Sequence, residues 1–396
     1  MLTLDSFRRL LTPNGQAALL AAERLTPTDA TLLRDLAALR KEFAPDLASA
    51  ALETVLLRQR ACAKFSRADH MYFTREALEQ ASGELVARHR AQRYVQADSP
   101  IYDICCSIGG DALELAEAGS VVGLDIDPLR LAIAEVNAAV YGRSERISFT
   151  LTDARGWAVP PNAWLFFDPA RRSGGRRHWQ PEDYEPPLSL IEFWLPNAAG
   201  IGVKVAPGID YDALPYDCEV EIVSVAGEVK EACLWFGALR RSTRSAVLLP
   251  GGHTLHAVPT APTPVVAPLR YLYEPDGAVI RAHLVEQLAA QIDAAKIDES
   301  IAFLTSDSLV HTPFARAFRV LETMPFNLKR LRARLRDLDI GQVVIKKRGS
   351  PIDPQVLEKQ LRLHGTHALT LVLTHVQGQP SVLLCEPSAP TPDRSP

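Results

Sequence analysis

Residues 102–128 read YDICCSIGGDALELAEAGSVVGLDIDP, in which two short apolar strands flank a small-residue turn and a helical pattern. The first strand carries an acid at Asp103, and the second ends in an acid at Asp125. Similar apolar runs alternate with helical stretches up to about residue 250, which predicts a parallel sheet with helices on both faces. Ligands bind such sheets at the carboxyl ends of the strands. The stretch therefore predicts an α/β fold with a ligand site at this turn.

The turn lacks the glycines that a dinucleotide site requires. That motif, G-x-G-x-x-G, lets the backbone approach a pyrophosphate closely, and the matching positions here are Cys105, Ser107 and Gly110. The sequence also has no G-x-x-x-x-G-K-[ST] phosphate loop. S-adenosylmethionine (SAM) carries no phosphate; it needs a small-residue turn and an acid at the end of the second strand, which accepts both ribose hydroxyls. Asp125 is placed for that role, and Asp127 is the neighbouring alternative.

Acids also end the third and fourth strands. The third strand ends in TLTDA, where Asp153 can accept a hydrogen bond from an adenine amino group, and the fourth ends in FFDPARR at Asp168. Acids at successive strand ends indicate one ligand site more strongly than any single acid does. Other roles stay open: a helix cap or a lysine pair for Asp103, a helix cap before Pro128 for Asp125, a turn for Asp153, and a helix cap or an arginine pair for Asp168.

These residues resemble the motifs of class I SAM-dependent methyltransferases. DICCSIGGDALELA resembles their D-x-G-x-G-x-G motif, with Gly109 kept and Cys105 and Ser107 in place of two glycines. GLDIDP resembles the ribose motif, and TDA resembles the adenine motif. Further segments resemble a bacterial subgroup with a C-terminal THUMP-like domain: residues 73–94, 168–172, 273–282 and 345–361. The resemblance implies an α/β fold: a Rossmann-like class I methyltransferase sheet, a helical N-terminal region and a small α/β THUMP-like C-terminal domain.

The resemblance implies an enzyme that transfers a methyl group from SAM, with RNA as the leading substrate class and a base amine as the candidate acceptor. We expect the cofactor to contact these residues: Asp103, Cys105, Ser107, Gly109, Gly110, Asp125, Ile126, Asp153, Ala154 and Asp168. We expect Asp168 to orient the acceptor, together with the backbone carbonyl of the turn that Pro169 restrains. Methylation of a protein or a small molecule is an alternative, as is a SAM- or RNA-binding protein without catalysis.

Basic segments supply candidate RNA contacts. Residues 170–180, ARRSGGRRHWQ, offer arginines for phosphates and an aromatic ring for base stacking. Residues 327–338, NLKRLRARLRDL, predict a helix with a leucine stripe and basic side chains off that stripe. A second basic segment, KKRGSP at residues 346–351, comes at the end of the next predicted strand. The expected substrate-binding residues are Arg171, Arg172, Trp179, Lys346, Lys347 and Arg348. The alternative for each segment is a basic surface exposed to solvent.

The composition excludes several classes of protein. The chain has 396 residues, too many for one core, and its net charge of -4 gives no general reason for nucleic-acid binding. Its six cysteines lack zinc spacing, so we expect no metal. No apolar run reaches the roughly 18 residues that span a bilayer, so we expect no membrane partner. The N-terminal residues lack a signal-peptide pattern, so we expect a cytoplasmic protein.

The order of the patterns predicts the domain organisation. Before residue 97 the patterns are helical: Pro45 opens one helix, and Thr74 caps another that covers 75–94. Residues 271–292 predict a new helical segment, and Gly365 is expected to end the second helix of the C-terminal domain. We expect a helical N-terminal domain at 1–96, the methyltransferase domain at 97–250, a linker and helical connector at 251–320, the THUMP-like domain at 321–387 and a disordered tail at 388–396.

Overall fold

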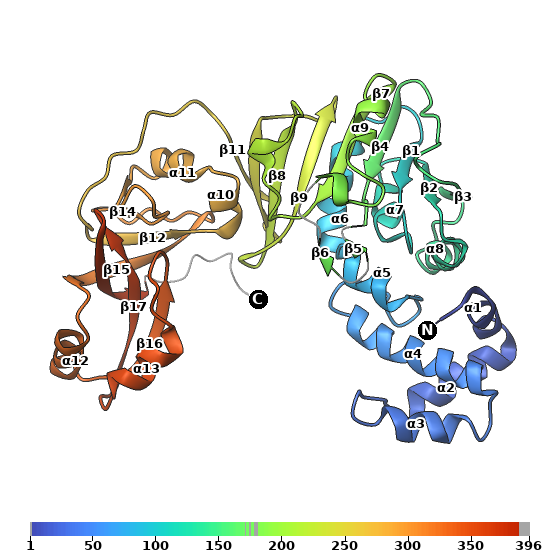
Figure 1. Ribbon diagram of the computed structural model, residues 1–396, viewed down its shortest axis with the longest axis horizontal. Helices are drawn as coiled ribbons and strands as arrows, with labels where there is room; N and C mark the ends of the chain where they lie inside the picture. Colours follow the sequence, from blue (N-terminus) through green and yellow to red (C-terminus); the bar gives the residue numbers. More distant parts are fainter. Residues whose placement is uncertain (1, 171, 174–175, 178–180, 388–396) are drawn as a thin grey trace. The chain divides into compact units, whose positions relative to one another are not determined.

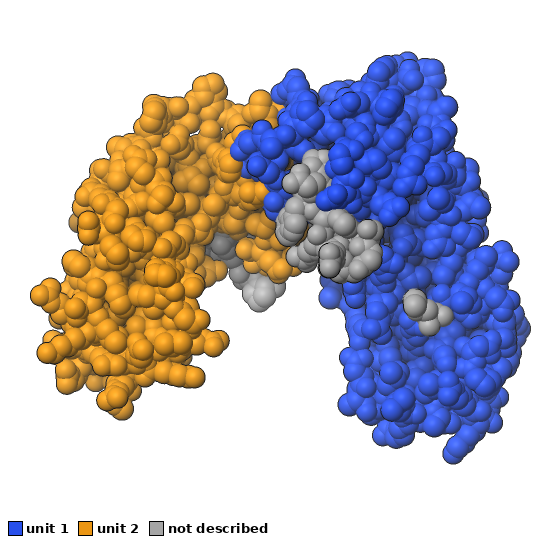
Figure 2. Space-filling model, viewed as in Figure 1, with its two compact units in different colours: residues 1–219, 231–241 blue, residues 220–230, 242–396 orange. Residues whose placement is uncertain are grey.

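The computed structural model describes residues 2–170, 172–173, 176–177 and 181–387, and its contacts divide the chain into two compact units (Figure 2). Unit 1 contains residues 1–219 and 231–241, and unit 2 contains residues 220–230 and 242–396. Each unit has its own cluster of buried apolar side chains.

The N-terminal region of unit 1 is helical, as predicted. Its helices begin where the sequence offers caps or proline: Thr12 and Thr74 accept hydrogen bonds from N–H groups of the first turn, and Pro45 opens its helix. The elements are α1 (Leu4–Leu10), α2 (Pro13–Arg24), α3 (Leu32–Leu39), α4 (Pro45–Ala61), α5 (Arg75–Gln80), α6 (Glu84–Ala91) and the short 3-10 helix η1 (Gln92–Tyr94).

The single helix predicted over 75–94 is wrong, because the structure divides it. Helix α5 ends at Gln80, Ala81 has extended backbone, and α6 follows. Lys64 Nζ donates to the carbonyl of Ala81 at 2.7 Å, which satisfies a carbonyl group that the broken helix leaves open. A partner from elsewhere in the chain therefore stabilises the end of α5, and helical periodicity gives no sign of it.

The sheet of unit 1 has the strand order β3-β2-β1-β4-β7-β9, in which β9 runs antiparallel to β7 and the other pairs are parallel (Figure 1). The strands are β1 (Ile101–Ile104), β2 (Val121–Asp125), β3 (Ile147–Leu151), β4 (Ala163–Phe167), β7 (Ala198–Val205) and β9 (Glu228–Gly237), of which residues 231–237 lie in this unit. The strand order reverses between β1 and β4, so their carboxyl ends open the crevice in which such sheets bind ligands.

Helices and short elements connect these strands. The helices are α7 (Gly110–Leu115), α8 (Pro128–Val140) and α9 (Leu190–Trp194). The short elements are the antiparallel pair β5 (Arg172–Ser173) and β6 (Arg176–Arg177) and the 3-10 helices η2 (Pro181–Asp183) and η3 (Tyr211–Ala213). Helix α7 starts directly at the small-residue turn, so the placement of α7 fixes the placement of the turn.

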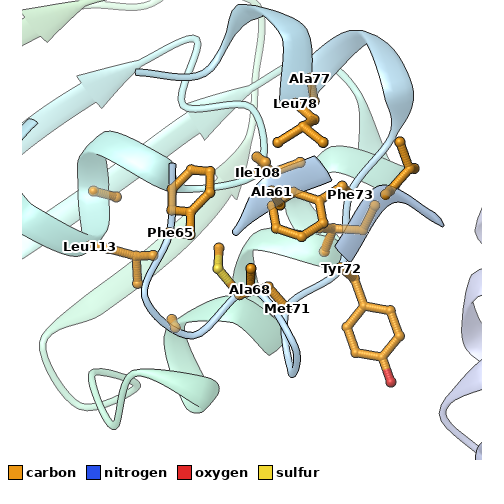
Figure 3. Packing of buried hydrophobic residues seen from close by; sticks show 14 of the residues in the cluster. Ala61, Phe65, Ala68, Met71, Tyr72, Phe73, Ala77, Leu78, Ile108 and Leu113 are labelled. Carbon is orange, nitrogen blue, oxygen red and sulfur yellow. The ribbon is translucent and has the colours of Figure 1, made fainter. Parts of the chain in front are cut away.

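The helical region and the sheet share one hydrophobic core, which supports that turn. Figure 3 shows Phe65, Phe73 and Leu78 of the N-terminal region beside Ile108 of the turn and Leu113 of α7. The rings of Phe65 and Phe73 lie 5.7 Å apart. Burial of apolar surface contributes about 25 cal/mol per Å². The N-terminal region therefore helps to hold the turn in place, through α5 and through the segment between α4 and α5.

Unit 2 contains strands in the order β11-β10-β8 and a seven-stranded sheet in the order β13-β14-β12-β15-β18-β17-β16. The first group is β8 (Glu219–Val225), of which residues 220–225 lie in this unit, β10 (Arg244–Leu249) and β11 (His253–His256). The seven-stranded sheet consists of β12 (Tyr271–Pro275), β13 (Ala295–Lys296), β14 (Leu304–Ser306), β15 (Ala315–Pro325), β16 (Ile340–Lys347), β17 (His367–Val376) and β18 (Gln379–Pro387). The helices are α10 (Gly277–Arg281), α11 (Val285–Gln291), α12 (Leu328–Asp337) and α13 (Pro354–Leu361).

Two local predictions in unit 2 are wrong. Residues 271–275 form β12 rather than part of a helix, because β14 and β15 take up its backbone hydrogen bonds on either side. Helix α13 ends at Leu361 rather than at Gly365, because Arg362 has left-handed backbone with φ 53°. The leucine stripe of α12 is confirmed, since Leu331 and Leu335 are buried. The domain boundaries stay a prediction.

Candidate active site

The turn after β1 has left-handed backbone at alternate residues. The φ angle is 64° at Cys105, 51° at Ser107 and 81° at Gly109, the positions at which the D-x-G-x-G-x-G motif carries glycine. This conformation costs a residue with a Cβ roughly 1–2 kcal/mol. A Cβ at Gly109 would lie 3.2 Å from the Cβ of Ala134. The chain therefore keeps the glycine conformation throughout, and keeps glycine itself where a neighbouring helix packs closely.

Asp125, the last residue of β2, fixes this turn. One carboxylate oxygen accepts the N–H of Ser107 at 2.8 Å, and the other accepts the N–H of Asp127 at 2.9 Å. Burial raises the pKa of Asp125, although these two hydrogen bonds oppose the rise. The cap of α8 is Asp127, whose carboxylate accepts the N–H of Leu129 at 2.8 Å. The alternative that Asp125 caps this helix is therefore wrong.

Asp103 on β1 is fully buried, and neither of its carboxylate oxygens has a hydrogen-bond partner among the residues that the structure describes. Burial raises the pKa of Asp103 well above its ordinary value; Asp111 and Asp168 add to the rise, and Arg90 opposes it. A buried polar group without a partner costs about 1–3 kcal/mol. In native proteins such groups mark catalytic sites, strain or bound species.

The turn and the strand ends surround one cavity of about 270 Å³ in unit 1. The predicted residues that line it are Asp103, Cys105, Ser107, Gly110, Asp125, Ile126, Asp153, Ala154, Asp168 and Pro169. Gly109 belongs to the turn but does not line the cavity. Ile126 is 63% exposed, so it presents a large apolar surface at the wall. Helix α5 forms another part of the wall through Glu76, Ala77 and Gln80.

Asp153 lies at the exposed rim of this cavity. Its carboxylate accepts the N–H of Arg155 at 2.9 Å and Nη1 of the same arginine at 3.4 Å. Arg155 also contacts Glu185 at 3.2 Å, and the backbone of Glu185 pairs with that of Ala170. Asp153 thus has the turn role that the sequence left open and also a place on the cavity wall.

Asp168, directly after β4, pairs with a lysine that the sequence analysis missed. Lys204 Nζ donates to Asp168 Oδ2 at 2.7 Å and to the carbonyl of Gln80 at 3.0 Å. The side chain of Lys204 is 3% exposed, and that of Asp168 is 21% exposed. Burial disfavours the ammonium form, but Asp168 and Asp111 outweigh it and raise the pKa of Lys204. A sequence signal did exist, since a lysine inside the apolar strand GIGVKVAP has no solvated position in a covered sheet.

Arg90 on α6 is a second buried cation that the sequence analysis missed. Its guanidinium pairs with Asp111 and Glu231, donates to Ser82 Oγ at 3.0 Å and lies 4.6 Å from the ring centroid of Phe166. Burial opposes the charged form, yet the two acids raise the pKa of Arg90 well above its ordinary value. The stretch LVARHRAQR around it is polar, so no local pattern marks Arg90 as buried.

The structure leaves three predicted RNA contacts without a description of their side chains. Arg171 and Trp179 lie outside the described residues. Only the backbone of Arg172 is described, in β5. Their assignment as substrate-binding residues therefore stays a prediction.

The other three predicted RNA contacts belong to unit 2, whereas the cavity belongs to unit 1. Lys346 Nζ contacts Glu274 at 2.6 Å, and Lys347 is exposed. The guanidinium of Arg348 lies 5.7 Å from the ring centroid of Phe303, and burial lowers its pKa. Lys347 is thus the one of the three that presents its charge to solvent.

Other kinds of site are not seen in the described part of the chain. Its side chains include no group of three or more His, Cys, Asp or Glu that could hold a metal ion. None of its helices is both long enough and apolar enough to cross a bilayer. Burial raises the pKa of Cys105 well above its ordinary value, which disfavours the reactive thiolate at the cavity wall. The ionisable groups that remain at the cavity are carboxylates and their basic partners.

Family models match three parts of the chain. A model described as THUMP domain-like matches residues 315–387, and one described as RNA cap guanine-N2 methyltransferase matches residues 99–160. A model of a domain of unknown function matches residues 3–61. The C-terminal match confirms the predicted THUMP-like domain type.

Relatives that match most of the chain identify the enzyme class. An uncharacterized S-adenosylmethionine-dependent methyltransferase of Mycobacterium tuberculosis, from strains CDC 1551 and H37Rv, is 38% identical over 341 residues, which cover 82% of this chain and 92% of the relative. A solved structure assigned as a methyltransferase from Porphyromonas gingivalis W83 matches with a TM-score of 0.74 at 21% identity, over 88% of this chain and 92% of that chain. This likeness confirms the predicted fold class. The chain therefore belongs to the SAM-dependent methyltransferases and is an enzyme that uses SAM as its methyl donor.

Proposed function

We propose that the protein methylates RNA at a base amine and that Asp168 orients this amine. The observation that carries the substrate class is the pair of family matches, THUMP domain-like at 315–387 and RNA cap guanine-N2 methyltransferase at 99–160. THUMP domains occur in RNA-modifying enzymes, and the N2 group of guanine is an exocyclic base amine. Both matches therefore favour RNA over a protein or a small molecule.

The charges around the cavity suit the polar groups of SAM. Asp103 has two carboxylate oxygens without partners among the described residues, and in this proposal they accept the ammonium group of the methionine part. In this proposal Asp125 accepts the ribose hydroxyls, and adenine lies against Asp153, Ala154 and Ile126, which line the cavity. The turn that would lie along the methionine part consists of Cys105, Ser107, Gly109 and Gly110. When bound, SAM supplies an electrophilic methyl group on a sulfonium centre.

Asp168 has the position and the charge to orient an amine. Lys204 Nζ donates to one oxygen, Oδ2, at 2.7 Å, and in this proposal the other oxygen, which accepts no hydrogen bond from the described residues, accepts the N–H of the amine. An amine that donates an N–H to this oxygen has its lone pair held in one direction, and the carboxylate stabilises the positive charge that develops on nitrogen. The same carboxylate can accept the proton that the methylated nitrogen releases. The carbonyl of Pro169 is a second acceptor at the same turn.

Each unit, taken by itself, contains basic residues that are candidate contacts to the RNA backbone in this proposal. On α12, Lys329, Arg330 and Arg336 are exposed, which suits phosphate contacts. The predicted contacts are Arg171, Arg172, Trp179, Lys346, Lys347 and Arg348. Phosphate contacts release counterions, so binding is expected to weaken steeply as the salt concentration rises.

The test is transfer of label from methyl-tritiated SAM to separated cell fractions: undermethylated RNA, protein and small metabolites. Asp168→Asn keeps the shape of the side chain and removes its charge, and Asp69→Asn is the matched control because Asp69 is exposed. We expect label in RNA, lowered about 100-fold by Asp168→Asn and unchanged by Asp69→Asn. Label confined to protein or metabolites would overturn the RNA assignment, and full activity of Asp168→Asn would overturn the role of Asp168.

A further inference from the structure

We propose that Lys204 is a positioning residue for methyl transfer: it fixes the carboxylate of Asp168 and ties it to helix α5 in the wall of the cofactor cavity. This inference rests on the proposed role of Asp168 in orienting the acceptor. Lys204 itself does not line the cavity. It acts on the reaction through the two groups that its ammonium holds.

The geometry around Lys204 joins two elements that are distant in the chain. Its ammonium donates to Asp168 Oδ2 at 2.7 Å and to the carbonyl of Gln80 at 3.0 Å. Asp168 follows β4, whereas Gln80 is the last residue of α5. Both of these residues line the cavity. One buried ammonium group therefore connects the residue that meets the acceptor with the helix that borders the cofactor.

Two lysines together satisfy the carbonyl groups at the end of α5. Lys64 Nζ donates to the carbonyls of Leu78 at 2.7 Å and Ala81 at 2.7 Å, and Lys204 takes that of Gln80. Cations are favourable at the C-terminal end of a helix, so both lysines stabilise α5. Of the two lysines, Lys204 is the one that contacts Asp168. The pair thus offers a comparison in which the helix-capping role is shared and the contact with Asp168 is not.

A purely structural role does not account for a lysine at this position. Burying an ion pair costs desolvation, and a well-packed apolar pair of similar volume is often as stable or more stable. The charged groups that face Lys204 are Asp168, Asp111 and Glu231, with Arg90 as a like charge. Arg90 already pairs with Asp111 and Glu231. Asp168 is therefore the acid for which Lys204 supplies the ion-pair partner. The ammonium group fixes the direction of a carboxylate that an apolar residue would leave unheld.

The first experiment compares Lys204→Met and Lys204→Arg with the matched control Lys64→Met in the full chain. Hydrogen exchange of the peptide that covers α5 and calorimetric binding of SAM need no acceptor. Both methionine variants are expected to speed exchange in α5 about tenfold, because each removes a capping cation. Neither should weaken SAM binding by more than about tenfold. Unchanged exchange in Lys204→Met would overturn the link between Lys204 and α5.

The second experiment measures kcat with undermethylated total RNA at saturating SAM. Lys204→Met is expected to lower kcat about 100-fold, since misplacement of a reacting group has effects of this size. Lys204→Arg should recover most of the loss, and Lys64→Met should keep kcat near that of the wild type. An equal loss of kcat in Lys64→Met would show that general loosening of α5 is responsible and would overturn the proposal.

A double-mutant cycle separates this inference from the proposed function. If Lys204 acts through Asp168, then Lys204→Met adds no further loss of kcat, within about threefold, in an Asp168→Asn background. Losses that multiply would overturn the positioning role.

If Asp168→Asn keeps full activity, the proposed role of Asp168 fails first. If Asp168→Asn is impaired while Lys204→Met is not, Asp168 keeps its role and only the inference about Lys204 fails. The double variant also removes both charges of the pair, so it tests the proposal even where Lys204→Met alone does not fold.

Discussion

Replacing Asp103 with Asn is expected to stabilise the free protein and to weaken its binding of SAM. Asp103 is fully buried, and its two carboxylate oxygens lack partners in the described part of the chain. Burial raises its pKa, so the folded protein binds this proton more tightly than the unfolded chain does. The stability that this proton supplies is complete below the pKa that Asp103 has in the unfolded chain. It is lost as the pH rises through the pKa that Asp103 has in the folded protein. Asn stays neutral and avoids that loss.

The size of the effect follows from the cost of ionising a buried carboxyl group without a partner, because an unsatisfied neutral group, Asn or protonated Asp, costs about 1–3 kcal/mol and an unsatisfied charged group costs more. The charged groups that face Asp103 are Asp111, Asp168 and Asp125, which disfavour its ionisation, and Arg90, which favours it. The acids outnumber the cation, so ionisation stays costly. We therefore expect Asp103→Asn to exceed the wild type by about 2 kcal/mol in the free energy of unfolding at about pH 9 and to match it near pH 4.

Urea unfolding of both proteins across this pH range measures the stability change, and titration calorimetry measures SAM binding. Loss of the charge-assisted bond to the ammonium group is expected to raise the Kd about 10- to 100-fold. The exposed Asp69 supplies the control, since Asp69→Asn should change neither quantity. A variant that is less stable than the wild type at both ends of the range would refute the claim that Asp103 lacks a partner. An unchanged Kd would remove Asp103 from the cofactor site.

Gly109→Ala is expected to lower the free energy of unfolding by about 1–2 kcal/mol, because φ is 81° and the new Cβ would lie 3.2 Å from that of Ala134. Urea unfolding checks this, and a loss below about 0.5 kcal/mol would contradict the strain. Asp298→Asn is expected to show the opposite pH dependence to Asp103→Asn. Burial alone would raise the pKa of Asp298, but hydrogen bonds from the N–H groups of Gly378 and Ser300 outweigh it and lower the pKa. The stability that ionised Asp298 contributes to the fold is therefore present above the pKa of this residue in the unfolded chain. It is lost as the pH falls through the pKa of Asp298 in the folded protein. Unfolding curves near pH 7 and near pH 2 should differ from the wild type only at the higher pH.

The strand ends are the part of the site that local sequence was able to locate. Asp103 and Asp125 lie in their strands, Asp168 directly follows β4, and Asp153 comes two residues after β3. These strands are neighbours in the sheet, and the four acids line one cavity. Asp125 and Asp168 come at the end of apolar runs, and an apolar run with an acid at its end is visible within a few residues of sequence. The α/β alternation then predicts parallel strands, and because parallel strands end at one edge of a sheet, these acids could be expected to lie near one another; the order of the strands was not predicted.

The buried cations could not be located in this way, because their partners are far apart in the chain. Arg90 and Glu231 are separated by 141 residues, and Lys204 and Asp168 by 36. The division between α5 and α6 has the same origin, since a lysine outside both helices satisfies the carbonyl group of Ala81. Periodicity and capping rules describe neighbours in sequence, whereas these features depend on contacts that exist only in the folded chain.

Charge placement also explains how the turn keeps its conformation with few glycines. Cys105 and Ser107 have left-handed backbone with φ angles of 64° and 51°, and this costs each of them roughly 1–2 kcal/mol. Against this cost, Asp125 accepts the N–H of Ser107 at 2.8 Å, and a hydrogen bond to a charged group contributes about 1.5–3 kcal/mol. The two quantities are comparable, so the carboxylate at the end of β2 can hold Ser107 in place without glycine. The acid at the second strand end is therefore a better guide to this kind of turn than the glycine pattern, because glycine only permits the conformation and the hydrogen bond favours it.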